Sequence, residues 1–119
     1  MMREGEKKTP AADDLLHTAI EVVGKTLAER GVRLEKVILF GSRAREEAAP
    51  DSDYDLYVLT DRDLDFPQRH AAITRIKREL AALRIPNDIV LRSVRSFDRV
   101  KDLPGNLAFE VAREGVPVP

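Results

Sequence analysis

The chain has 119 residues, of which 43% are hydrophobic and 34% charged, and its formal net charge at pH 7 is −1. That length fits one domain with a buried core, so we expect no second domain. The absence of cysteine excludes disulfides, thiolate metal sites and cysteine nucleophiles, and two histidines exclude a three-histidine zinc centre. The balanced charge gives no overall attraction to nucleic acid, and we do not expect direct nucleic-acid binding.

The ends and the hydropathy of the chain predict a cytoplasmic protein with no membrane partner. No apolar run approaches the roughly 20 residues of a membrane span. The charged residues 1–8 lead into no apolar segment of the kind found in signal peptides. We therefore predict a flexible N-terminus over 1–8 and one domain over 9–119.

The first half of the domain alternates helix and strand. Thr9 and Pro10 suit a helix start, so we predict a helix over 10–30, ended by Gly31 and supported by apolar residues at helical spacing, Leu16, Ile20, Val23 and Leu27. The continuous apolar run 37–40 predicts a strand covered on both faces. Residues 42–47 are compatible with a short helix, and the β-rich segment 53–59 predicts a second strand.

The second half continues this alternation. An acidic turn over 61–65 leads to Pro67, which opens a helix with apolar residues at helical spacing, Ile73, Ile76, Leu80 and Leu83. Residues 88–91 predict a third strand and 97–100 a helical turn. A final helix is capped by Asn106 and closed by Gly115, and 116–119 form a tail or an edge strand. The alternation predicts an α/β (α+β) fold, a small sheet of three to four strands flanked by helices.

Gly41 and Ser42 follow the first predicted strand and open a short helix. Glycine lets a backbone approach a phosphate closely, and the first N–H groups of a helix and a serine hydroxyl bind phosphate oxygens. Arg43 could bind the same oxygens through two N–H groups, although it equally suits a solvated helix face. Taken alone, glycine and serine after a strand more often form a tight turn, so this site depends on its neighbours.

Three aspartates supply the chemistry that a phosphate site needs. Asp53 and Asp55 share one face of the second strand because side chains alternate along a strand, and Asp88 begins the third strand. Carboxylates are the ligands that Mg²⁺ prefers, and a metal would offset their mutual repulsion. If the two strands are neighbours, Asp53, Asp55 and Asp88 form a catalytic metal cluster, with room for two ions in an in-line phosphoryl displacement.

Residues 39–45 (LFGSRAR) and 52–56 (SDYDL) resemble the polymerase β-like nucleotidyltransferase superfamily, and the short GSRAR form resembles its minimal nucleotidyltransferases. The resemblance implies a mixed sheet flanked by helices. It also implies that Gly41 and Ser42 bind the phosphates of a nucleoside triphosphate, while Asp53 and Asp55 bind metal. Asp88 would be the third carboxylate, which helps to activate the acceptor hydroxyl.

In the minimal group, the resemblance implies an antitoxin that transfers AMP from ATP to a tyrosine of a helical HEPN-type ribonuclease toxin. One departure is Glu46, where many members carry a small residue, because inward-pointing acids here would oppose nucleotide binding. Two alternatives stay open. The chain could neutralise its partner by binding alone, or it could modify RNA or a small molecule through a pocket built by a dimer.

Overall fold

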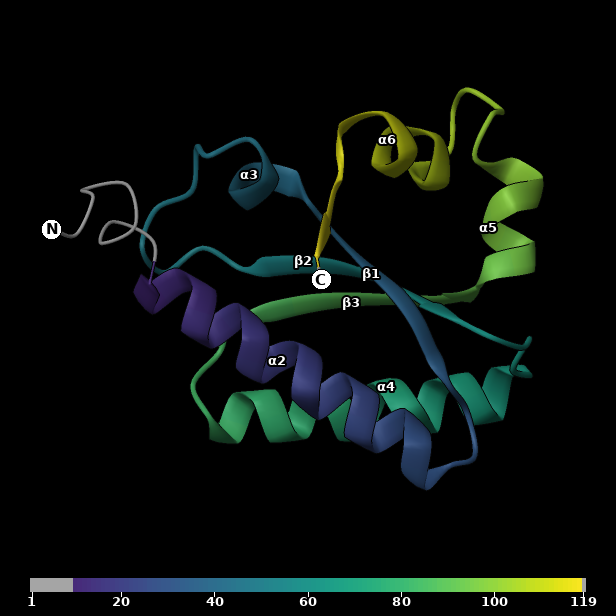
Figure 1. Ribbon diagram of the computed structural model, residues 1–119, viewed down its shortest axis with the longest axis horizontal. Coiled ribbons are helices and arrows are strands. Elements are labelled where there is room, and N and C mark those ends of the chain that lie inside the picture. The colour runs from purple at the N-terminus through teal and green to yellow at the C-terminus, as the bar shows by residue number, and fades with distance from the viewer. Residues whose placement is uncertain (1–9, 119) are drawn as a thin grey trace, which may run out of the picture.

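A four-stranded mixed sheet lies at the centre of the molecule, whose computed structural model describes residues 10–118 (Figure 1). The strands run in the order β3-β2-β1-β4. Their bounds are Leu34–Phe40 for β1, Tyr54–Thr60 for β2, Asn87–Ser93 for β3 and Val116–Val118 for β4. Strand β1 pairs antiparallel with β2 and β4, whereas β2 and β3 are parallel. The predicted fold class is confirmed, and residues 116–118 are an edge strand.

Helices cover both faces of this sheet. Helices α2 (Pro10–Glu29) and α4 (Phe66–Ala82) pack on one face, and α5 (Val94–Val100) and α6 (Leu107–Glu114) lie over the other (Figure 1). The short helix α3 (Gly41–Ala44) follows the end of β1. No helix in residues 10–118 is long and apolar enough to cross a membrane.

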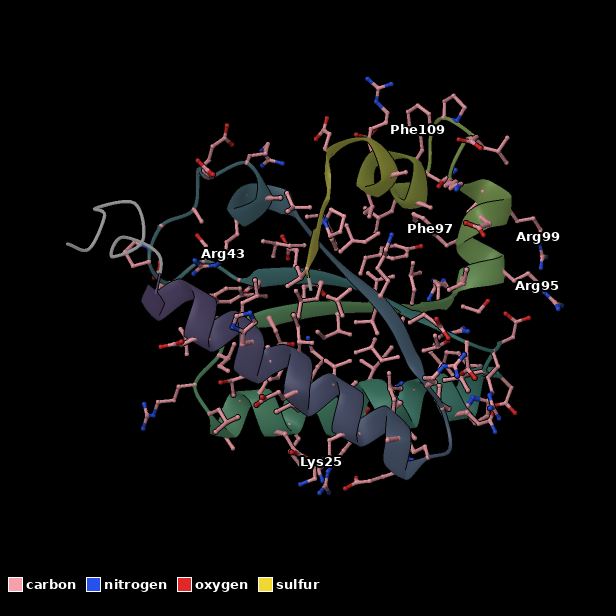
Figure 2. The ribbon with its side chains drawn as sticks, in the orientation of Figure 1. Lys25, Arg43, Arg95, Phe97, Arg99 and Phe109 are labelled. Atoms are coloured by element: carbon pink, nitrogen blue, oxygen red, sulfur yellow. The ribbon has the colours of Figure 1, made fainter. Side chains whose placement is uncertain are left out.

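The hydrophobic core has two parts, one on each face of the sheet. Val37 belongs to the larger part, under α2 and α4, and its neighbour Ile38 belongs to the smaller part, under α5 and α6. This confirms the prediction that the 37–40 run is covered on both faces. In the smaller part, Phe97 reaches from α5 towards the sheet, and its ring centroid lies 5.3 Å from that of Tyr57 (Figure 2).

Several element ends were predicted from their capping residues. Gly31 has a φ of +74° and follows α2, and the Asn106 side chain accepts a hydrogen bond from the Phe109 N–H at the start of α6. Thr9 and Pro119 lie outside the described residues. Helix α4 begins at Phe66, one residue before the predicted Pro67, because Asp65 and Gln68 form a reciprocal capping box.

Other boundaries differ from the predictions for identifiable reasons. Strand β1 starts at Leu34, three residues before the predicted run 37–40. The additional residues include the exposed, polar Glu35 and Lys36, which lie where the pairing with β2 is irregular. An apolar run cannot identify such residues. Helix α5 starts at Val94 rather than 97, since the Ser93 side chain accepts a hydrogen bond from the Ser96 N–H.

Candidate active site

The three predicted aspartates meet at one end of the sheet. Asp55 on β2 is paired directly with Asp88 on the parallel strand β3 and with Phe40 on β1. Directly paired residues direct their side chains to the same face, so the carboxyl groups of Asp55 and Asp88 lie on the side covered by α5 and α6. Asp53 is exposed and lies in the loop that leads into β2. The strand was predicted to begin at Asp53, but it begins one residue later, at Tyr54.

The charge on Asp55 is electrostatically unfavourable. Burial raises the pKa of this carboxyl, and the nearby negative charges of Asp88 and then Asp53 raise it further. Arg45 opposes these effects and lowers the pKa of Asp55. The carboxyl groups therefore lie close enough to repel one another, and a bound cation would relieve that repulsion.

These residues fit Mg²⁺ through the chemistry of their donor atoms. Mg²⁺ takes oxygen ligands, keeps several waters and is bound by one or two carboxylates together with substrate phosphates. Within residues 10–118, no three acidic or histidine side chains are grouped closely enough to enclose a metal by themselves. The arrangement therefore suits a cation bound jointly by Asp53, Asp55, water and a nucleotide, rather than one enclosed by protein ligands alone.

Gly41 brings the start of α3 directly onto Asp55. Its φ of +74° is one that glycine adopts without strain, and a Cβ added there would overlap the Asp55 Oδ2. No side chain caps the N-terminus of α3, whereas α4, α5 and α6 are each capped by a side chain. The first turn of α3, which contains the half-buried Ser42, therefore presents backbone N–H groups beside the carboxylates.

Arg43 is directed towards the loop before β2 (Figure 2). Its Nε and Nη2 donate hydrogen bonds to the Ser52 carbonyl at 3.1 and 2.8 Å, and Nη2 also donates to the Pro50 carbonyl at 3.1 Å. The guanidinium lies 3.9 Å from the centroid of the Tyr54 ring. Arg43, which was predicted to contact the nucleotide, thus binds the segment that leads into Asp53.

Arg45, which follows α3, is the arginine whose charge acts on Asp55, and it was not among the predicted site residues. Its Nε donates to the Glu47 carboxylate at 2.9 Å. Glu46 and Glu47 are exposed, so neither occupies the interior beside Gly41. Residues two positions apart on a helical turn point in different directions. The spacing of Arg43 and Arg45 could therefore have indicated that only one of them faces Asp55.

We predict that Arg43→Ala destabilises the fold by about 2 kcal/mol, through the loss of charge-assisted hydrogen bonds and of the contact with Tyr54. Urea unfolding followed by circular dichroism measures this change. Arg45→Ala is the matched control and should change the unfolding midpoint much less, because the Arg45 side chain donates its hydrogen bond to Glu47 in an exposed ion pair. Equal unfolding midpoints for the two variants would contradict the anchoring role of Arg43.

The raised pKa of Asp55 predicts a pH-dependent stability. A carboxyl with a raised pKa in the fold holds its proton more tightly than in the unfolded chain, so its ionisation destabilises the fold. The penalty is absent below the ordinary value of 3.8 and grows as the pH rises through the raised value. Without metal, Asp55→Asn should therefore raise the melting temperature at pH 7, and the gain should vanish below about pH 4.

Thermal melts of wild type and Asp55→Asn between pH 3 and pH 8, with a chelator present, measure this difference. Asp51→Asn, in the exposed loop before β2, controls for the loss of one negative charge. A gain that persists unchanged at pH 3, or that Asp51→Asn reproduces, would show that repulsion at Asp55 is not its cause.

Comparison with known proteins agrees with this geometry. The family model described as Polymerase beta, Nucleotidyltransferase matches residues 23–118. A search of curated protein sequences found no match. Among solved structures, the chain is similar to a toxin–antitoxin crystallised with AMP-PNP, at 22% identity and a TM-score of 0.51, over 82% of this chain and 69% of the other.

A second similar structure is the toxin–antitoxin MntA–HpeT, in a mutant with two aspartate-to-glutamate substitutions two positions apart. The identity is 18% and the TM-score 0.54, over 85% of this chain and 69% of the other. At such identities the likeness concerns the fold. The family model, by contrast, matches residues 23–118, a range that includes all the candidate site residues. The chain belongs to the polymerase beta nucleotidyltransferase family.

Proposed function

We propose that this chain is an Mg²⁺-dependent nucleotidyltransferase that acts in the cytoplasm as an antitoxin, transferring AMP from ATP to a HEPN-type helical toxin. The observation that carries the proposal is the juxtaposition of Gly41, Asp55 and Asp88. It combines an uncapped helix start, which suits phosphate, with paired carboxylates, which suit a metal.

Each residue has a distinct role in this proposal. Asp53 and Asp55 hold Mg²⁺, which supplies charge stabilisation to the phosphates when bound, and a second ion fits the same chemistry. The α3 start with Gly41 and Ser42 binds phosphate oxygens. Arg43 contributes by fixing the loop that carries Asp53.

The proposed transfer is an in-line displacement at the α-phosphorus of ATP. The acceptor hydroxyl oxygen forms a bond to this phosphorus, and the bond from the phosphorus to the oxygen bridging to the β-phosphate breaks. Pyrophosphate leaves with the bond electrons, and Asp88 accepts the proton of the hydroxyl. Asp88 is suited to this role because it is exposed, at the start of an edge strand, beside Asp55.

The partner is supported by the similar structures and by the resemblance in the motif. Both similar structures are toxin–antitoxins, one of them with AMP-PNP. The mutated aspartates in the other have the same two-residue spacing as Asp53 and Asp55. The helical HEPN class of the toxin comes from the resemblance of the GSRAR and SDYDL segments to minimal nucleotidyltransferases.

The test is incubation of the protein with ATP labelled at the α-phosphate, Mg²⁺ and the protein encoded beside its gene. We expect label on that partner, located by mass spectrometry as AMP on a tyrosine. Absence of transfer, together with growth rescue that survives Asp53→Asn/Asp55→Asn in cells, would instead indicate neutralisation by binding. Label on RNA or a small molecule without the partner would also overturn the proposal.

A further inference from the structure

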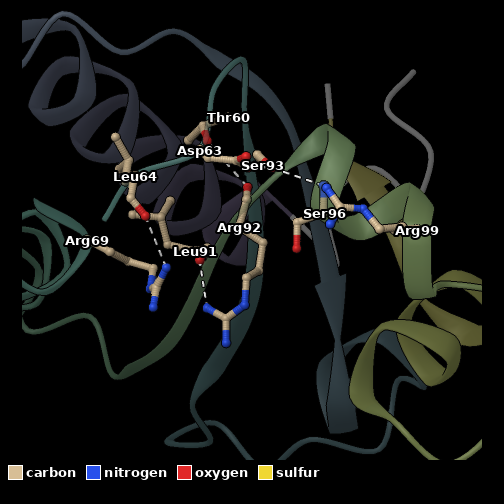
Figure 3. A pocket seen from close by; sticks show the side chains of 9 residues that line it. All are labelled: Thr60, Asp63, Leu64, Arg69, Leu91, Arg92, Ser93, Ser96 and Arg99. Atoms are coloured by element: carbon tan, nitrogen blue, oxygen red, sulfur yellow. Dashed lines mark hydrogen bonds between the residues drawn. The ribbon is translucent and has the colours of Figure 1, made fainter. Parts of the chain in front are cut away.

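A polar pocket, drawn in Figure 3, lies at the end of β2 and β3 that is opposite to the aspartates. It has a volume of about 200 Å³. Its walls include Thr60 and Ser93, the last residues of the two strands, together with side chains from α4 and α5. The strands are parallel, so their starts carry the aspartates and their ends carry this pocket.

Three arginines from three elements line the pocket: Arg69 of α4, Arg92 of β3 and Arg99 of α5 (Figure 3). Among the described residues, none of them forms an ion pair. Arg69 donates to the Leu64 carbonyl at 3.3 Å and Arg92 to the Leu91 carbonyl at 2.8 Å. Each guanidinium has five N–H donors, so most of this donor capacity remains for a ligand.

One acid also lines the pocket, and it does not balance the three cations. Asp63 accepts a hydrogen bond from the Ser93 hydroxyl, which fixes its carboxylate at the wall. Three guanidinium groups and one carboxylate leave two positive charges facing the pocket. Cations gathered without counter-charges repel one another, and an anionic ligand would relieve this repulsion.

The pocket lies at the same edge of the sheet as the candidate active site, and one of its arginines shares a face with Asp88. Arg92 pairs with Leu59 as Asp88 pairs with Asp55, and the even spacing from 88 to 92 places both side chains on one face of β3. Four residues along a strand correspond to about 13 Å. Strand β3 is the outer strand of the sheet, so a macromolecule that reaches Asp88 along this edge also covers the arginines.

We propose that Arg69, Arg92 and Arg99 form a docking subsite for an acidic segment of the acceptor protein, and that this contact positions its hydroxyl at Asp88. This inference rests on the proposed function, which supplies the acceptor protein that would dock here. Charge complementarity carries it, because guanidinium groups bind the carboxylates of Asp and Glu side chains through paired hydrogen bonds.

The experiment measures binding of the protein encoded beside this gene by calorimetry, without nucleotide, at low and high salt. Arg69→Ser, Arg92→Ser and Arg99→Ser should each weaken binding about tenfold at low salt, and the triple variant should lose most of the salt dependence. Matched controls from the same helices are Arg78→Ser and Arg95→Ser, which do not line this pocket. In transfer assays the pocket variants should raise the KM for the acceptor and leave Mg²⁺–ATP binding unchanged.

Two small probes test the chemistry of the pocket directly. A hexapeptide rich in glutamate should shift the Nε–Hε resonances of the three arginines, whereas inorganic phosphate should not compete with it at equal concentration. Pocket variants that bind the partner like the controls would overturn the proposal, and so would a phosphate-only response. Arginine-dependent binding without any AMP transfer would overturn the proposed function while retaining a docking site.

Discussion

Asp55→Asn is expected to abolish nucleotidyl transfer, lowering its rate by about 10³-fold or more. The amide keeps the size of the side chain but loses the charge that binds a metal, beside Asp88 on the neighbouring strand. Transfer of labelled AMP to the partner at saturating Mg²⁺ measures the effect. Asp53→Asn is expected to behave in the same way, because both carboxylates are proposed metal ligands.

The same substitution is expected to stabilise the metal-free protein at pH 7, because it removes a half-buried negative charge that Asp88 and Asp53 repel. Activity and stability should therefore change in opposite directions, which excludes unfolding as the cause of the lost activity. Asp51→Asn, in the exposed loop, should retain both at wild-type levels. Transfer by Asp55→Asn above about a tenth of the wild-type rate would contradict a metal-binding role.

Much of the fold follows from local patterns in the sequence. The apolar spacing from Leu16 to Leu27 and the left-handed glycine after it define α2, and Asn106 marks the start of α6. These signals are short-range, since a capping side chain or a helical stripe acts within a few residues. The starts of β1 and α5 were placed too late because exposed polar residues and a serine cap carry no apolar signal.

The candidate site depends on one long-range fact that no local pattern contains. Asp55 and Asp88 are 33 positions apart, and they meet because β2 and β3 are parallel neighbours in register. From the sequence alone, the cluster could be predicted only on the condition that the strand of Asp88 lies beside the strand of Asp55. The rigid frame of the strands then fixes the separation of the Asp55 and Asp88 carboxyl groups. Asp53 instead lies in the loop before β2, which is anchored by hydrogen bonds from Arg43 to the Ser52 carbonyl and from the Ala49 N–H to the Ser52 hydroxyl.

The orientation of side chains was less predictable than the positions of elements. Arg43 and Arg45 are the same residue type, two positions apart. Arg43 nevertheless contacts the loop before β2 and the Tyr54 ring, whereas the charge of Arg45 acts on Asp55. Arg43 lies within α3, whereas Arg45 follows it, just before Glu46 adopts a φ of +60° and the helix stops after one turn. Likewise, Arg69, Arg92 and Arg99 belong to two separate basic runs in the sequence, and only tertiary packing gathers them.

Gly41→Ala is expected to inactivate the protein by displacing Asp55. The added methyl group would overlap the Asp55 Oδ2, and a non-glycine residue at a φ of +74° is strained by about 1–2 kcal/mol. Either the carboxylate or the first turn of α3 must move, which separates the proposed metal ligand from the phosphate-binding N–H groups. We expect transfer to fall by about 10²-fold or more.

Gly31→Ala separates the two causes of this effect. Gly31 has the same φ of +74°, but a Cβ added there meets nothing within 4 Å. Both variants should lose the stability that the left-handed backbone costs, and Gly41→Ala should lose more because of its overlap with Asp55. Only Gly41→Ala should lose transfer activity and Mg²⁺–ATP affinity. If Gly31→Ala lost activity equally, backbone strain would account for the effect. If Gly41→Ala remained active, the close approach of α3 to Asp55 would be unnecessary for the chemistry.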